Sequence, residues 1–204
     1  MRLNNKVAIV TGAASGFGEG IARRFAAEGA KVVVADITED AGQTIAADLV
    51  DAAHFIRADV TSAADWKALV DGTIAHFGRL DIVVNNAGYT HLNQPMLDVQ
   101  EAEFDRVYAV NVKSLYLSAQ AAVPVFRNQG SGQFLNIAST AGIRPRPGLV
   151  WYNSSKSAAI GITRSMAIEL AAEQIRVNAI NPVAGETPLL KRFMGQDTPE
   201  KRAA

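Results

Sequence analysis

Short runs of consecutive apolar residues alternate with longer segments of mixed polarity along the sequence. Six apolar runs lie at 7–10, 31–35, 54–58, 80–84, 133–138 and 176–180. Runs that are apolar on both faces are typical of strands buried between helix layers in a parallel sheet. Between these runs, amphipathic segments at 16–29, 39–50, 63–77, 99–128 and 151–173 predict helices.

The boundaries of the predicted helices agree with this division. Asp59 to Ser62 supply capping residues before the third helix, and Gly29 and Gly78 stand at the ends of the first and third helices. Strands that alternate with helices through right-handed crossovers give a doubly wound parallel sheet, a Rossmann fold with helices on both faces. Because no repeat, linker or low-complexity tract interrupts the pattern, we expect residues 1–204 to form a single domain.

Composition and charge exclude several classes of protein. The chain is 49% hydrophobic and 20% charged, and its 20 Lys+Arg balance its 20 Asp+Glu, so no net field attracts nucleic acid or an anionic membrane. It has no cysteine, and its three histidines lack ligand-like spacing, so we expect no disulfide and no metal site. No apolar run approaches the roughly 20 residues of a membrane span, and the start lacks a signal-peptide pattern. We therefore expect a soluble cytoplasmic protein without nucleic-acid or membrane partners.

Chemically interesting residues follow the predicted strands. In an open parallel sheet the ligand lies outside the carboxyl ends of the strands, where the strand order reverses. One such residue comes directly after each apolar run: Gly12, Asp36, Asp59, Asn85, Ser139 and Pro182. This placement predicts that they meet at one edge of the sheet.

The first of these positions begins a glycine-rich turn that runs from Thr11 to Gly18, with glycines at 12, 16 and 18. Glycine lets backbone N–H groups approach a pyrophosphate, and the helix N-terminus favours the anion. Asp36 ends the second strand, where a carboxylate can bind the ribose hydroxyl pair and repel a 2′-phosphate. The sequence thus favours NAD over NADP. The alternative is an ordinary strand-to-helix turn followed by a capping aspartate.

Tyr152 and Lys156 are four residues apart, so they share one face of a predicted helix. Lowering a phenol pKa from about 10 to about 7 takes roughly 4 kcal/mol. One ammonium at contact supplies up to about 4 kcal/mol at an effective dielectric of ~20, so Lys156 is expected to supply much of this. Ser139 can hydrogen-bond a substrate oxygen beside the phenol. Alternatively the pair lies on a helix surface and Ser139 is a turn residue.

Taken together, the Gly-x-x-x-Gly-x-Gly turn, the segment from Asn85 to Gly88 and the Ser139/Tyr152/Lys156 set resemble the short-chain dehydrogenase/reductase family, in its single-domain branch. The resemblance extends over about residues 7–190. It implies that Tyr152 is the acid/base and that Ser139 orients the substrate. It gives Lys156 two roles, lowering the phenol pKa and binding the nicotinamide ribose. It also implies that Asn111 helps to hold a water that relays protons from Lys156, whereas the residue alone suggests only a locally bonded amide.

The same resemblance implies the cofactor contacts. The adenine ring is expected against Asp59 and Val60, and the carboxamide against the loop after the sixth strand, although Val183 stands where the family usually has glycine. The complete expected set for the nicotinamide cofactor is Gly12, Ser15, Gly16, Phe17, Gly18, Asp36, Asp59, Val60, Asn86, Ala87, Gly88, Tyr152, Lys156, Pro182, Gly185 and Thr187.

The resemblance implies an NAD-dependent oxidoreductase that interconverts a small-molecule secondary alcohol and a ketone, as a homodimer or homotetramer built on its two long helices. A 3-oxoacyl thioester reductase, a non-catalytic NAD sensor and a methyltransferase are the alternatives. Arg144 to Pro147 are expected near the substrate mouth, where they attract an acidic substrate or are merely solvated; His91, Gln94 and Trp151 are expected there too. Relatives continue with a helix over the substrate and a final strand, so with the sequence ending at Ala204 we expect the last strand to be missing.

Overall fold

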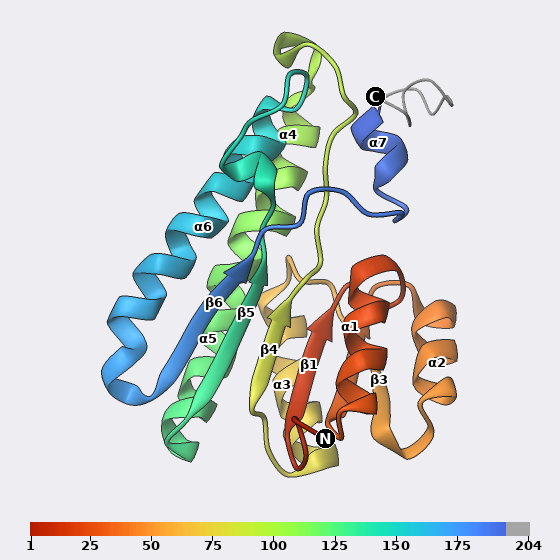
Figure 1. Ribbon diagram of the computed structural model, residues 1–204, viewed down its shortest axis with the longest axis vertical. Coiled ribbons are helices and arrows are strands. Elements are labelled where there is room, and N and C mark those ends of the chain that lie inside the picture. The colour runs from red at the N-terminus through yellow and green to blue at the C-terminus, as the bar shows by residue number, and fades with distance from the viewer. Residues whose placement is uncertain (195–204) are drawn as a thin grey trace.

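The computed structural model describes residues 1–194, and its centre is a six-stranded parallel sheet (Figure 1). The strand order is β3-β2-β1-β4-β5-β6, and every neighbouring pair is parallel. The predicted doubly wound sheet is confirmed, with each strand within two residues of its apolar run. The strands are β1 Val7–Thr11, β2 Lys31–Asp36, β3 Ala53–Arg57, β4 Ile82–Asn85, β5 Gly132–Ile137 and β6 Ile175–Ile180.

The helices follow the predicted order with one interruption. The predicted helix at 99–128 is two helices, α4 and α5, joined by a π-helical turn at Ala109–Lys113. A π turn carries an extra residue and often marks a functional site, and here it contains Asn111. The helices are α1 Gly16–Ala27, α2 Glu39–Asp48, α3 Ala63–Phe77, α4 Glu101–Tyr108, α5 Ser114–Gln129, α6 Val150–Leu170 and α7 Leu190–Met194.

The two faces of the sheet bury separate hydrophobic clusters, because successive side chains of a strand point to opposite faces. Ala8 and Val10 of β1 pack in the cluster that includes α1 and α2, whereas Ile9 between them packs in the cluster that includes α3 and α5. Helices therefore cover both faces, as predicted.

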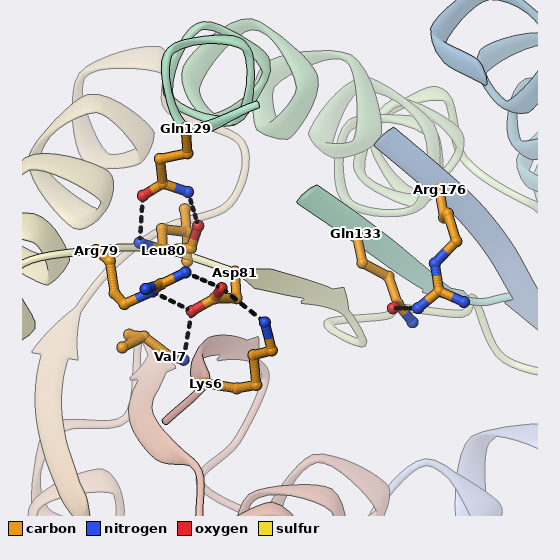
Figure 2. Close-up of polar contacts among 8 residues, drawn as sticks. All are labelled: Lys6, Val7, Arg79, Leu80, Asp81, Gln129, Gln133 and Arg176. Carbon is orange, nitrogen blue, oxygen red and sulfur yellow. Dashed lines mark hydrogen bonds and ion pairs between the residues drawn. The ribbon is translucent and has the colours of Figure 1, made fainter. Parts of the chain in front are cut away.

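Asp81 joins the amino ends of β1 and β4, at the end of the sheet opposite the strand tips (Figure 2). Its buried carboxylate accepts hydrogen bonds from Val7 N at 2.9 Å and from both Nε and Nη2 of Arg79, and it pairs with Lys6 Nζ at 3.4 Å. Burial works to raise the pKa of Asp81, but these donors and charges outweigh it, so the pKa lies below its usual value. The network stabilises the sheet away from the carboxyl ends.

The strand order reverses between β1 and β4, which creates a crevice above their carboxyl ends. The chain after β6 crosses this region and forms α7 above the sheet (Figure 1). Within residues 1–194 no strand follows β6, and residues 195–204 lie outside the described part. None of the helices in the described part is long and apolar enough to cross a membrane.

Candidate active site

A cavity of about 430 Å³ lies at the carboxyl ends of the strands and brings together most of the residues that the sequence singled out. Ser139, Tyr152 and Lys156 line it, as do all the expected cofactor residues except Gly18. Asn111 does not line it either. The structure therefore places one nucleotide-like turn and one proton-transfer set around the same space.

The glycine-rich turn is held against the end of β4. Asn86 Nδ2 donates to the carbonyls of Thr11 and Gly12, at 2.8 and 3.1 Å, and the Thr11 hydroxyl accepts from the backbone N–H of Asn86 and Ala87. Gly18 lies behind the turn, where a Cβ would stand 2.1 Å from Gly12 O and 2.5 Å from Asn86 Nδ2. Gly18 thus serves close packing of α1 on the turn rather than direct lining of the cavity.

The amino end of α1 opens onto the cavity without a side-chain cap. Ser15 is the N-cap residue, but its hydroxyl makes no capping hydrogen bond. Gly12 and Gly16 both have φ near +60°, at 63° and 57°, a backbone conformation that favours glycine. Uncapped N–H groups at a helix N-terminus beside a glycine turn fit a pyrophosphate, which they can bind through the backbone.

The carboxylate of Asp36 fixes the adjoining loop. Its Oδ2 accepts from Ala14 N at 3.0 Å, and its Oδ1 accepts from Thr38 N at 2.9 Å. An ionised carboxylate has about four acceptor positions, so two remain for ribose hydroxyls. Asp59 and Val60 continue the same end of the cavity beyond Asp36.

The loop after β6 covers the glycine turn. A Cβ on Gly185 would lie 2.4 Å from the ring of Phe17, and one on Gly16 would lie 3.1 Å from the Thr187 methyl group. Pro182 O accepts from Thr140 N at 3.1 Å, which ties the loop to the end of β5. The loop is thereby placed between the nucleotide turn and Ser139.

Tyr152 and Lys156 lie in the first two turns of α6, and both are almost completely buried, with 7% and 5% of their surfaces exposed. Lys156 Nζ lies 5.8 Å from the centre of the Tyr152 ring and donates to Ile137 O at 2.9 Å. The ring of Phe193 in α7 meets the Tyr152 ring edge-on, with centroids 4.9 Å apart. The two residues share one helix face, as predicted.

The expected lowering of the Tyr152 pKa is wrong for this geometry. Burial raises the pKa of the phenol above 10, and a hydrogen bond with Ser139 and the charge of Arg146 only partly oppose this. The sequence shows the Tyr-to-Lys spacing but not the burial, and burial penalises the charged form. Burial also lowers the pKa of Lys156 from 10.5 to about 8, because no described carboxylate pairs with the ammonium.

Asn111 is bound on all sides by protein groups. Its Oδ1 accepts from Tyr89 N at 2.9 Å, and its Nδ2 donates to Tyr89 O at 2.8 Å and to Ser155 Oγ at 2.9 Å. The side chain therefore joins the π turn, the loop after β4 and α6. This is the locally bonded amide that the residue alone suggested; the water relay stays a prediction.

Several cavity residues were missed from the sequence, among them Tyr89, Arg106 and Phe193. Tyr89 directly follows the Asn85–Gly88 segment, which was a usable signal, whereas nothing local marks Phe193. His91 was expected at the mouth but is fully buried and does not line the cavity, and Trp151 and Gln94 are also absent from its walls. Of the two arginines between Ser139 and Tyr152, only Arg146 lines the cavity. No cluster of three or more potential metal ligands occurs within residues 1–194.

A parallel sheet with a glycine-lined anion cradle at its switch point, and with Ser, Tyr and Lys around the same cavity, defines a dinucleotide-binding oxidoreductase. The family model described as short chain dehydrogenase matches residues 6–197. The chain belongs to this family, whose members are enzymes that act on CH–OH groups of small molecules with a nicotinamide cofactor.

Individual relatives and solved structures agree with this assignment. The chain is 53% identical to 4-formylbenzenesulfonate dehydrogenase of Comamonas testosteroni, over 99% of this chain and 82% of the relative. It is 39% identical to 3-alpha-(or 20-beta)-hydroxysteroid dehydrogenase of Mycobacterium tuberculosis, over 92% of this chain and 72% of the relative. A crystal structure of 3-ketoacyl-(acyl-carrier-protein) reductase from Brucella melitensis with NADH has 47% identity and a TM-score of 0.93, covering 94% of this chain and 81% of that one.

Proposed function

We propose that this enzyme interconverts a secondary alcohol and a ketone with NAD, and that Tyr152 transfers the proton. The observation that carries the proposal is the shared cavity, in which Ser139, Tyr152 and Lys156 stand beside the glycine-rich turn. A structural helix pair has no need to border a nucleotide cradle. The bound nicotinamide would accept or give the hydride.

Each residue of the set has a distinct task in this proposal. Tyr152 takes the proton from the alcohol oxygen in oxidation and returns it in reduction, as a general acid/base. Ser139 is fixed at the end of β5, where its Oγ accepts from Ala141 N at 3.1 Å, and its hydroxyl orients the substrate oxygen. Lys156, held by the Ile137 carbonyl, binds the nicotinamide ribose and brings a cation near the phenol.

The preference for NAD rests on Asp36. Its carboxylate lies at the cavity wall, ordered by Ala14 and Thr38, where it can accept from the 2′- and 3′-hydroxyls of the adenosine ribose. A 2′-phosphate in the same place meets a like charge, which disfavours NADP. Among the lining residues at this end, none is a cation that could receive the phosphate.

The other cofactor contacts are proposed on the same ground. The backbone of the glycine turn with Ser15 and Phe17 holds the pyrophosphate, Asp59 and Val60 border the adenine, and the segment from Asn86 to Gly88 forms the adjoining wall. The loop with Pro182, Gly185 and Thr187 faces the carboxamide. Asn111 acts through Tyr89 and Ser155, as a positioning residue for the set.

The relatives indicate the range of substrates rather than one compound. Their names include an aromatic sulfonate aldehyde, a hydroxysteroid, cyclopentanol and a 3-ketoacyl thioester. The cavity walls near Tyr152 are apolar, with Leu149, Leu189 and Phe193 among them, which suits a small cyclic or aromatic alcohol. A 3-oxoacyl thioester reductase is the second candidate, favoured by the similarity to the ketoacyl reductase structure.

We also propose that residues 1–204 act as one cytoplasmic unit that assembles as a homodimer or homotetramer. Large apolar side chains on the two long helices support the assembly, because Tyr116 of α5 and Ile168 of α6 are 59% and 82% exposed.

The test is a spectrophotometric screen of NAD and NADP reduction across alcohol classes, with the Tyr152→Phe variant and a Tyr116→Phe control. We expect turnover with NAD on at least one class, a loss of roughly 10²-fold or more in Tyr152→Phe, and no change in Tyr116→Phe. Equal turnover by Tyr152→Phe contradicts the acid/base role. Tight NADH binding without any hydride transfer indicates an NAD sensor instead.

A further inference from the structure

The charged residues of the cavity are sorted by sign along the sheet. The acidic lining residues, Asp36 and Asp59, follow β2 and β3, on one side of β1. The guanidinium groups, on Arg106 and Arg146, come from α4 and from the loop between β5 and α6, on the other side of β1. The proposed nucleotide half is therefore acidic at its far end, and the substrate half is basic.

Arg146 is held close to the reacting groups by its backbone. Its carbonyl accepts from Asn153 Nδ2 at 2.8 Å, so the residue is fixed to the helix turn that carries Tyr152. Prolines at 145 and 147 restrict the backbone on either side of Arg146. The positive charge of Arg146 is near enough to the phenol to lower the pKa of Tyr152 in part.

Arg106 reaches the same half of the cavity from α4. Its guanidinium lies over the ring of Tyr89, 4.2 Å from the centroid, and Val110, four residues further on, lines the cavity with it. Arg192 lies against the same ring at 4.7 Å, but it is paired with Glu103 at 2.9 Å. Glu103 also accepts from the Tyr89 hydroxyl at 2.8 Å, so this carboxylate is already engaged.

Neither cavity arginine is neutralised within residues 1–194. No described carboxylate lies within ion-pair distance of Arg106 or Arg146, whereas Arg192 beside them has Glu103. Two cations that face one cavity repel each other, and the repulsion is relieved when an anion binds between them. Guanidinium forks also match the planar geometry of a carboxylate and the oxygens of a sulfonate.

We propose that Arg106 and Arg146 bind an anionic group of the substrate, so that this enzyme prefers alcohols and ketones that carry a carboxylate or sulfonate. The inference rests on the proposed function and narrows its substrate class. The reacting carbon lies beside Tyr152, the apolar body of the substrate packs against Leu149 and Phe193, and the anion faces the two arginines.

The test compares substrates that differ only in charge. 4-(1-Hydroxyethyl)benzoate and the matching benzenesulfonate are each compared with the neutral 4-(1-hydroxyethyl)benzamide and with 1-phenylethanol, by kcat/KM with NAD. We expect a preference of about tenfold or more for the two anions, consistent with hydrogen bonds to charged groups. The preference should fall in Arg106→Gln and in Arg146→Gln, while Arg146→Lys keeps part of it. Arg144→Gln is the matched control, because Arg144 does not line the cavity.

A binding measurement keeps the result independent of turnover. Calorimetry of 4-acetylbenzoate and 4-acetylbenzamide on the NADH-loaded enzyme should show tighter binding of the acid, weakened by salt and by either Gln variant. NADH affinity and thermal unfolding should not change in these variants. Equal binding of the acid and the amide overturns the inference, even if alcohols are oxidised. Loss of all hydride transfer with the anion preference intact contradicts the proposed function instead.

Discussion

At the scale of single residues, burial decides the chemistry of the Tyr152–Lys156 pair. Burial raises the pKa of the phenol and lowers that of the ammonium to about 8, so each change favours the neutral form. The phenol is therefore protonated at neutral pH in the structure described here. Alcohol oxidation needs its ionised form, so we expect oxidation to be favoured at alkaline pH and ketone reduction at lower pH.

The buried Lys156 predicts how stability depends on pH. Between its folded pKa of about 8 and its ordinary value of 10.5, the unfolded chain binds the proton and the folded chain does not. The free energy of unfolding should therefore rise by about 2–3 kcal/mol between about pH 8 and pH 10. Tyr152, whose folded pKa is raised, opposes this only above pH 10.

Urea unfolding at the two pH values measures this dependence. Lys156→Met keeps the length of the side chain and removes the titrating group, so its free energy of unfolding should change little over the same range. An equal rise in both proteins would show that other groups are responsible.

At the scale of elements, the close packing of α1 on the glycine turn sets the shape of the cradle. A methyl group on Gly18 would overlap Gly12 O and Asn86 Nδ2, and the first of these is backbone that cannot turn aside. Gly20, in the same helix, has nothing within 4 Å of the position of a Cβ. The two glycines therefore form a matched pair.

We predict that Gly18→Ala destabilises the protein by about 1–3 kcal/mol, as overpacking does, and weakens NADH binding about tenfold or more. Gly20→Ala should be neutral or slightly stabilising, because alanine has the higher helix propensity. Thermal unfolding and titration with NADH give both quantities. Similar effects of the two substitutions would contradict the packing account.

The same scale shows where prediction from sequence succeeded. The strands were predictable because runs such as 7–10 and 31–35 are apolar on both faces, which only a covered parallel sheet explains. The π turn at Ala109–Lys113 was not, because the hydrophobic pattern runs through it unchanged. Its cause is the pairing of Asn111 with the backbone of Tyr89, 22 residues away in sequence.

The site was predictable only in part for a similar reason. Residues that follow strands, such as Gly12 and Ser139, were found because the topology alone brings strand ends together. Arg106 and Phe193 reach the cavity from α4 and α7, and no periodicity locates those contacts. The direction of the Tyr152 pKa change was also missed, because burial is known only once the fold is assembled.

At the scale of the whole molecule, stability and chemistry lie at opposite ends of the sheet. The Asp81 network joins the amino ends of β1 and β4, whereas the cavity lies at the carboxyl ends (Figures 1 and 2). Substitutions at one end should therefore leave the other end largely unaffected.

Asp81→Asn tests this separation. Loss of the buried charge that binds Arg79 and Val7 should lower the free energy of unfolding by about 1–3 kcal/mol, with kcat and KM nearly unchanged. Because the pKa of Asp81 is lowered in the fold, its contribution is present above the ordinary aspartate pKa and is lost as the pH falls below it. The variant should lose this acid dependence, and an equal loss of activity and stability would contradict the prediction.

The most direct test of the central claim is the single-turnover rate of NADH formation from an accepted alcohol, measured over a range of pH. In the natural enzyme the rate should rise with pH as the Tyr152 phenol ionises and then level off. In Tyr152→Phe it should be slower by roughly 10²-fold or more and should lose that pH dependence. An unchanged rate and an unchanged pH profile in Tyr152→Phe would contradict the account.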